Sequence, residues 1–258
     1  MKKLSKIVLM VLVCISCRQE VPDDQKMDKI AAYITIHAIG DSTMANKPNP
    51  EENPERGWVQ MFSGFLTNSV TVKNHAINGR STRSFINEKR WDSVYHHLKK
   101  GDYVFIQFGH NDQKANDPHR YTNPHTAYRQ NLMRFIKESR DKEAIPVLFT
   151  SIVRRNFNEH GTLVDTHGAY PQEARLVAQE LDVPLIDLQY LTEKMEESFG
   201  VEASKKLHLH YQPHEIPFYP EGKVDDTHLS ILGATEVAKL AIMELERKIP
   251  ALSKRFKI

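Results

Sequence analysis

Ser42 lies in the segment Gly40-Asp41-Ser42-Thr43, directly after a run of alternating apolar residues. This order predicts a strand, a sharp turn and the beginning of a helix. A serine at such a position presents its hydroxyl at the carboxyl edge of a parallel sheet, where open α/β folds bind ligands. Asp and Ser are also common helix N-caps, so capping is an ordinary alternative explanation. A chemical role for Ser42 therefore requires partners elsewhere in the chain.

The segment Asp225-Asp226-Thr227-His228, near the C-terminus, offers a base. A neutral imidazole can take the serine proton, and a carboxylate on its other nitrogen fixes the tautomer. An Asp three residues before a His, in a loop that enters a helix, can fold back to reach the ring. The alternative is that Asp226 or Thr227 caps the following helix and His228 lies on the surface.

Donors for a negative tetrahedral oxygen follow two further strands. Gly79, in the segment 74–82, could present its backbone N–H without a side chain in the way, and Asn111, in Gly109-His110-Asn111-Asp112, could donate from its side-chain amide. Asn-Gly pairs and Asn-Asp pairs also occur in plain turns, so each segment has an explanation without chemistry.

These segments resemble the four blocks of the SGNH hydrolases, also called the GDSL esterase family. The blocks match as Gly40-Asp41-Ser42, with Thr43 where many members have Leu, then as Asn78-Gly79, Gly109–Asp112 and Asp225-x-x-His228. The resemblance spans about residues 34 to 245. It implies that Ser42 is the nucleophile, His228 the general base and acid, and Asp225, rather than Asp226, the residue that orients His228. It also implies an oxyanion hole formed by the Ser42 and Gly79 N–H groups and the Asn111 amide.

Within the family, the chain looks most like the rhamnogalacturonan acetylesterases. The similar pieces are the four blocks, Glu55-Arg56-Gly57-Trp58, and the extensions 79–85 and 109–114. The resemblance implies removal of acetyl groups from galacturonic acid units of pectin, through an acyl-serine intermediate and without a metal or organic cofactor. Other acetylated glycans such as xylan or sialic acid, or a lipid ester, are alternative substrates. A glycan-binding surface lipoprotein without catalysis is a further alternative, against which the complete set of site residues argues.

Arginines at the same sheet edge suit a polyanionic substrate, because a guanidinium matches the geometry of a carboxylate. Arg80 and Arg83 flank the second block, and Arg154 and Arg155 follow the fourth predicted strand. We expect one or more of them to bind uronate carboxylates, with surface charges or internal salt bridges as the alternative. His208, His210 and His214 are interpreted as part of a surface or substrate-contacting loop rather than a metal site. His75 and His110 are expected to be core or supporting residues.

The elements that must position these residues alternate along the chain, which favours a parallel sheet covered on both faces. The family resemblance implies the same fold, a three-layer α/β/α sandwich of flavodoxin-like type with a five-stranded parallel sheet. One domain over residues 31–258 is expected. Residues 109–124 and 207–227 are predicted to be long irregular loops. The predicted strands are 34–39, 70–75, 103–108, 146–152 and 183–188, and the predicted helices are 58–66, 91–98, 127–140, 171–181, 191–199 and 232–248.

The composition is that of a globular protein, with 40% hydrophobic and 26% charged residues. A formal charge of +2 and the lack of a long Lys/Arg block give no electrostatic reason to expect a nucleic-acid partner. Both cysteines, Cys14 and Cys17, lie near the N-terminus. A mature domain that begins at or after Cys17 would therefore contain no internal disulfide.

The N-terminus has the pattern of a secretory signal over residues 1–16. Three lysines precede a short apolar run, and Ser16-Cys17 is similar to the end of a bacterial lipoprotein signal. Removal of these residues takes away three lysines and no acids, so the charge of +2 becomes −1. Residues 17–30 are expected to form a polar tether from a lipid anchor at Cys17, with simple secretion as the alternative. This predicts an extracytoplasmic protein, in the periplasm or anchored to the outer membrane of a bacterium.

Overall fold

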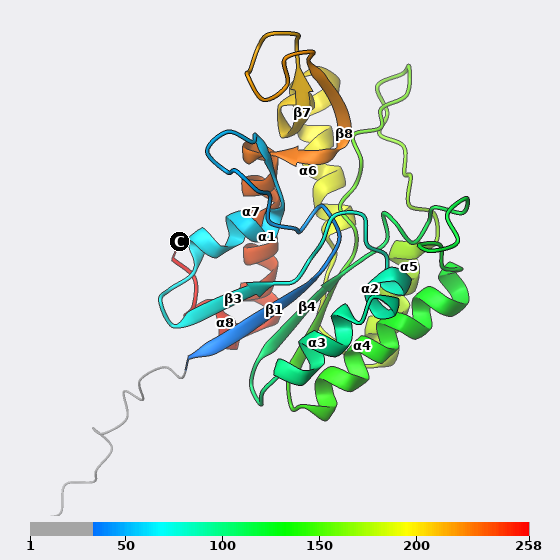
Figure 1. The fold of residues 1–258 in the computed structure, drawn as a ribbon, viewed down its shortest axis with the longest axis vertical. Coiled ribbons are helices and arrows are strands. Elements are labelled where there is room, and N and C mark those ends of the chain that lie inside the picture. The colour runs from blue at the N-terminus through cyan, green and yellow to red at the C-terminus, as the bar shows by residue number, and fades with distance from the viewer. Residues whose placement is uncertain (1–32, 258) are drawn as a thin grey trace, which may run out of the picture. The chain divides into compact units, whose positions relative to one another are not determined.

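A parallel sheet lies at the centre of the structure, a computed structural model that describes residues 33–257 (Figure 1). Its strand order is β3-β1-β4-β5-β6, and every neighbouring pair is parallel. The strands are β1 (Ile34–Gly40), β3 (Val70–Asn74), β4 (Tyr103–Gln107), β5 (Ile145–Phe149) and β6 (Leu185–Ile186). This confirms the predicted five-stranded parallel sheet. The predicted signal, the anchor at Cys17 and the tether over residues 17–30 lie outside the described residues.

Helices cover both faces of this sheet, as the alternating side chains of the strands require. In β4, Phe105 packs into one apolar core, whereas Val104 and Ile106 pack into the other. The first core is closed mainly by α1, α6, α7 and α8, and the second by α2, α3, α4 and α5. The structure is therefore the predicted three-layer α/β/α sandwich.

The helices agree with the predicted segments except in their ends and in the two short helices α2 and α8, which were not predicted. The predicted helix 191–199 lies within α6, whose helical geometry breaks at Gly200, where φ is 73°. A π-helical turn, η2 (Pro124–Tyr128), leads into α4. The helices are α1 (Trp58–Phe62), α2 (Thr82–Asn87), α3 (Arg90–His97), α4 (Arg129–Asp141), α5 (Tyr170–Glu180), α6 (Leu188–Ala203), α7 (Ile231–Lys248) and α8 (Pro250–Ser253).

Helix α7 shows how the sequence builds one of these layers. Its N-cap is Ser230, whose side chain accepts a hydrogen bond from the Gly233 N–H. Its buried residues recur at helical spacing, so that one stripe faces the sheet: Ala234, Val237, Ala238, Ala241, Ile242 and Leu245. Because the strand that carries His228 leads directly into α7, the packing of this helix also fixes that strand.

A second, antiparallel sheet was not predicted. Its order is β2-β8-β7, with β2 (Glu55–Arg56), β7 (His208–Tyr211) and β8 (Lys223–Ser230). The prediction of an irregular loop over residues 207–227 is therefore wrong at both of its ends. These strands were not predicted because they contain many histidines and charged residues, whereas strands are recognised in a sequence by their apolar residues. Within residues 33–257, no helix combines the length and apolar character needed to cross a membrane.

Candidate active site

The structure brings Ser42, His228 and Asp225 into one line of hydrogen bonds. His228 Nε2 lies 2.9 Å from Ser42 Oγ, and His228 Nδ1 lies 2.8 Å from Asp225 Oδ2. Because an ionised carboxylate only accepts hydrogen bonds, Nδ1 carries the hydrogen of the neutral imidazole. The Nε2 lone pair therefore faces the serine hydroxyl, which is the arrangement that general-base activation requires.

The Asp225 carboxyl is held in its ionised form. Its Oδ1 accepts hydrogen bonds from the Thr227 N–H at 2.9 Å and from the His228 N–H at 3.0 Å. Burial by itself would raise the pKa of Asp225, but the hydrogen bonds from the His228 ring and from these two N–H groups outweigh it and hold that pKa far below its usual range. The Asp225 carboxylate can therefore orient His228 and stabilise the positive charge of its ring when that ring is protonated.

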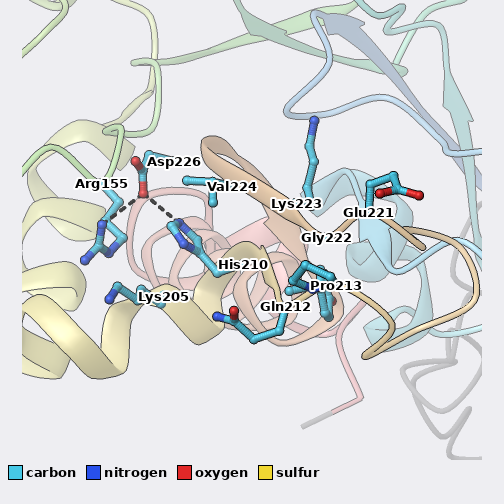
Figure 2. A pocket seen from close by; sticks show the side chains of 11 residues that line it. Arg155, Lys205, His210, Gln212, Pro213, Glu221, Gly222, Lys223, Val224 and Asp226 are labelled. Atoms are coloured by element: carbon cyan, nitrogen blue, oxygen red, sulfur yellow. Dashed lines mark hydrogen bonds and ion pairs between the residues drawn. The ribbon is translucent and has the colours of Figure 1, made fainter.

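Asp226, the competing candidate, faces the other way. Its Oδ1 accepts hydrogen bonds from Arg155 Nη1 at 3.0 Å and from His210 Nε2 at 2.7 Å. Figure 2 shows both side chains pointing to Asp226 at one end of a pocket of about 570 Å³ along the β7–β8 hairpin. The geometry thus gives Asp225, and not Asp226, the contact with His228.

A bulge in β8 makes the contact between Asp225 and His228 possible. Residues three apart in a regular strand lie about 10 Å apart along it. Here Leu209 pairs with Asp225 but its neighbour His208 pairs with Leu229, so three residues of β8 oppose none of β7. The extra residues bend the strand back, so that the Asp225 side chain reaches the His228 ring. The prediction that these residues lie in a loop before a helix is wrong, because they belong to a strand.

The residues after Gly40 form turns rather than the predicted helix. The N–H groups of Met44 and Ala45 donate to the Asp41 carbonyl at 3.2 and 3.1 Å, and no helix begins before α1 in this described part of the chain. Two prolines, at positions 48 and 50, oppose a helix here. Asp41 Oδ1 accepts from the Thr43 N–H and hydroxyl, each at 2.9 Å. The Asp41 side chain therefore stabilises the turn rather than capping a helix, while the Ser42 hydroxyl contacts His228.

The segments that carry the predicted oxyanion donors are joined by hydrogen bonds. No described residue accepts a hydrogen bond from the backbone N–H of Ser42 or of Gly79. Gly79 has φ +77°, a backbone conformation that favours glycine. Asn111 Nδ2 donates one hydrogen to the Arg80 carbonyl at 3.1 Å, which leaves its second hydrogen available. The three predicted donors thus come from neighbouring segments, and each has a hydrogen to give.

Lys47, which the sequence analysis missed, holds two of these segments together. Its Nζ lies 2.7 Å from the Ser42 carbonyl, 2.8 Å from Asn78 Oδ1 and 2.7 Å from Glu55 Oε1. The side chain is buried, so the carboxylate and the two oxygens replace its hydration. Nothing in the sequence marks this lysine, since its partners come from separate segments.

Two of the predicted substrate arginines, Arg80 and Arg83, lie on the exposed side of the second block. Arg80 Nη2 forms an ion pair with Glu88 at 3.0 Å. Arg83 Nη1 donates to the Pro118 carbonyl at 3.3 Å and forms no ion pair with a described residue. Arg80 therefore forms an internal salt bridge, which was the alternative to binding a uronate. The charge of Arg83 is not neutralised by a described residue.

The other two predicted substrate arginines, Arg154 and Arg155, differ in their partners. Arg154 Nη1 donates to Thr166 Oγ1 at 2.9 Å, and no described carboxylate pairs with it. Arg155 is tied to Asp226 and also donates to Ser204 Oγ at 3.0 Å and to the Val201 carbonyl. The Arg155 guanidinium is therefore bound by groups of the protein itself, and it contacts Asp226 rather than His228.

Of the three histidines assigned to a surface or substrate-contacting loop, His208 is placed differently. It is buried, and its Nε2 lies 2.7 Å from Glu196 Oε1. His210 contacts Asp226, and His214 lies in the exposed connection between β7 and β8. Among the described residues, no three His, Cys, Asp or Glu side chains are grouped to hold a metal ion.

His110 and His75 each contact a second histidine whose side chain is buried. His110 Nδ1 is 3.1 Å from His167 Nε2, and His37 Nδ1 is 3.1 Å from His75 Nε2. Burial lowers the pKa of His75 to about 4 and that of His167 to about 3. These rings are therefore neutral supports near pH 7 rather than additional bases.

The chain is similar to known proteins over most of its length. Residues 38–234 match the model of the GDSL-like lipase/acylhydrolase family. The chain is 45% identical to the rhamnogalacturonan acetylesterase RhgT of Bacillus subtilis, over 83% of this chain and 90% of that protein. It is 34% identical to the probable rhamnogalacturonan acetylesterase YesY of the same organism, over 80% and 89%. The solved structure of B. subtilis YxiM superposes with a TM-score of 0.71 at 27% identity, covering 84% of this chain and 57% of that one.

The family model covers most of the chain, and the matched region contains Ser42, Gly79, Asn111, Asp225 and His228. The two curated relatives are matched over nearly their whole lengths. The chain belongs to the GDSL-like lipase/acylhydrolase family and is a carboxylic ester hydrolase.

Proposed function

We propose that this protein is a serine esterase that removes O-acetyl groups from rhamnogalacturonan. The observation that carries the proposal is the chain of hydrogen bonds from Asp225 through His228 to Ser42. In addition, no described residue accepts a hydrogen bond from the candidate oxyanion N–H groups. The relatives that are named rhamnogalacturonan acetylesterases support the choice of acyl group and of polysaccharide.

The first half of the reaction forms an acyl-serine. Ser42 Oγ attacks the acetyl carbonyl carbon while His228 Nε2 takes the hydroxyl proton, and Asp225 stabilises the imidazolium. The carbonyl oxygen becomes an oxyanion and receives hydrogen bonds from the N–H groups of Ser42 and Gly79 and from Asn111 Nδ2. When the tetrahedral intermediate collapses, the bond to the sugar oxygen breaks, and His228 returns its proton to that oxygen.

The second half releases acetate. Water attacks the acyl carbon and gives a proton to His228 Nε2, and the same donors stabilise the second oxyanion. Collapse breaks the bond to Ser42 Oγ, and the proton on His228 restores the serine hydroxyl.

Acetate release from acetylated rhamnogalacturonan tests this proposal. The wild type should release acetate, and Ser42→Ala should lower kcat by on the order of 10⁴ or more, because the nucleophile is lost. Ser253→Ala, on α8 and outside the site, is the matched control and should retain wild-type kcat. A circular dichroism spectrum checks that both variants are folded.

The choice of substrate is tested with a panel of acetylated rhamnogalacturonan, xylan and sialic acid. The highest kcat/KM should be on rhamnogalacturonan. A higher kcat/KM on another glycan would contradict the proposed substrate, and full activity of Ser42→Ala would contradict the proposed mechanism.

A further inference from the structure

A pocket of about 770 Å³ lies in the loop that follows the third block. It is lined by residues 113–118 and by Arg120, and we call it the loop pocket. Its volume is within the usual range for a small-ligand site. Arg83 Nη1 donates to the Pro118 carbonyl on its wall, which joins α2 to this loop.

The loop pocket adjoins the candidate oxyanion donors. Arg120 Nη1 donates to Asn111 Oδ1 at 3.3 Å. The same Nη1 would lie 3.9 Å from a Cβ atom placed on Gly79. A sugar unit bound in this pocket would therefore lie next to the groups that face the reacting carbonyl.

The charges of the loop pocket are unbalanced. Lys114 forms no ion pair with a described residue, and Asp117, the one carboxylate in the lining, is already 2.5 Å from Arg120 Nε. Arg120 Nη2 donates to no described residue. Partial burial and the charges of Arg120 and Arg154 lower the pKa of Lys114. The pocket therefore favours an additional negative charge.

The pocket along the β7–β8 hairpin differs in this respect (Figure 2). There Asp226 neutralises Arg155 and contacts His210, and Lys205 lies 2.8 Å from Glu202. The cations of that pocket thus have carboxylate partners within the protein.

We propose that the loop pocket binds the carboxylate of a galacturonate unit, through Lys114 and the Nη2 edge of Arg120. The inference rests on the proposed function and extends it, because it assigns the recognition of the uronate to residues outside the four predicted arginines. Arg120 contacts Asn111 and the bound carboxylate together, so that binding of the correct sugar stabilises the orientation of the oxyanion donor.

Lys114→Gln tests the proposal, with Lys205→Gln in the hairpin pocket as a matched control. The substrates are acetylated rhamnogalacturonan oligosaccharides with free carboxylates and the same oligosaccharides with methyl-esterified carboxylates. For the free acid, Lys114→Gln should raise KM about fivefold to tenfold, as loss of one ion pair to a charged group does. Lys114→Gln should also discriminate less between the two substrates than the wild type does, whereas Lys205→Gln should match the wild type.

Equal KM values for Lys114→Gln and Lys205→Gln on the free acid would overturn the inference. A second measurement separates it from the proposed function: calorimetric binding of the deacetylated free-acid oligosaccharide, which needs no catalysis. Weaker binding by Lys114→Gln than by Lys205→Gln supports the inference even if no acetate is released. Equal binding overturns it even if acetate release confirms the esterase.

Discussion

At Asn111, two hydrogen bonds decide which way the side-chain amide faces. Arg120 donates to Oδ1, and the Arg80 carbonyl accepts from Nδ2. With the amide oxygen and one amide hydrogen engaged, the second hydrogen remains for an oxyanion. Arg120 therefore acts on the proposed reaction through Asn111, as a positioning residue.

Asn111→Ala should lower kcat by on the order of 10²–10³, because one preorganised oxyanion donor is removed. Arg120→Gln should lower kcat by a smaller factor, since the donor remains but is held less firmly. The measurement is kcat on a neutral substrate, 4-nitrophenyl acetate, so that carboxylate recognition does not contribute. In the Asn111→Ala background, Arg120→Gln should have no further effect on kcat.

Independent effects of Asn111→Ala and Arg120→Gln on kcat would show that Arg120 does not act through Asn111. A wild-type kcat for Asn111→Ala would show that its amide is not an oxyanion donor.

Among the secondary-structure elements, the end of β1 sets the position of Ser42, the proposed nucleophile. Gly40 pairs with Gln107 of β4, and the turn that contains Ser42 begins at the next residue. A Cβ atom on Gly40 would lie 2.6 Å from the Gln107 carbonyl oxygen and 2.3 Å from Met44 Sδ. A strand and a turn approach each other here more closely than a side chain allows.

Gly40→Ala should therefore destabilise the protein by about 1–3 kcal/mol and lower kcat, because the turn must shift away from β4. Gly64→Ala is the matched control, since a Cβ atom at Gly64 has no neighbour within 4 Å. Urea unfolding at pH 7 gives the two free energies of unfolding, and acetate release gives kcat. Equal stability of the two variants would contradict the close approach at Gly40.

For the whole molecule, buried ionisable groups determine the response to acid. Burial lowers the pKa of four histidines, His37, His75, His110 and His167. Burial raises the pKa of Asp41, and it raises that of Asp112 to about 7. As pH falls below 6.5, the histidines of the unfolded chain take up protons that the folded chain does not. The two aspartates have the opposite effect, but they are fewer.

The free energy of unfolding should therefore fall as pH falls from about 6.5 to about 4. Each proton taken up only by the unfolded chain contributes about 1.4 kcal/mol per pH unit. His75→Gln should reduce the slope by about one such proton, because the pKa of His75 in the folded chain is about 4. Urea unfolding at pH 7, 6, 5 and 4 measures both slopes, and identical slopes would show that His75 takes up protons equally in both states.

Much of the architecture could be predicted from the sequence because it depends on local pattern. Alternating apolar residues gave the five parallel strands, and helical periodicity gave all the longer helices. The blocks around Ser42, Gly79, Asn111 and His228 follow strands or precede a helix, so they could be proposed to meet at one sheet edge. The second sheet could not be predicted, because β7 and β8 are rich in charged residues and histidines and are stabilised by pairing with each other.

The sequence by itself determined which residue types were available for acyl transfer and in which order they occur. Only the tertiary structure decided that Asp225 contacts His228 while Asp226 contacts Arg155, since a bulge in β8 separates the two neighbours. Only the fold brings Lys47 to Asn78, and Arg120 to Asn111 beside Gly79. Such contacts join segments that are not adjacent in the chain, and their geometry depends on the packing of the whole domain rather than on local sequence.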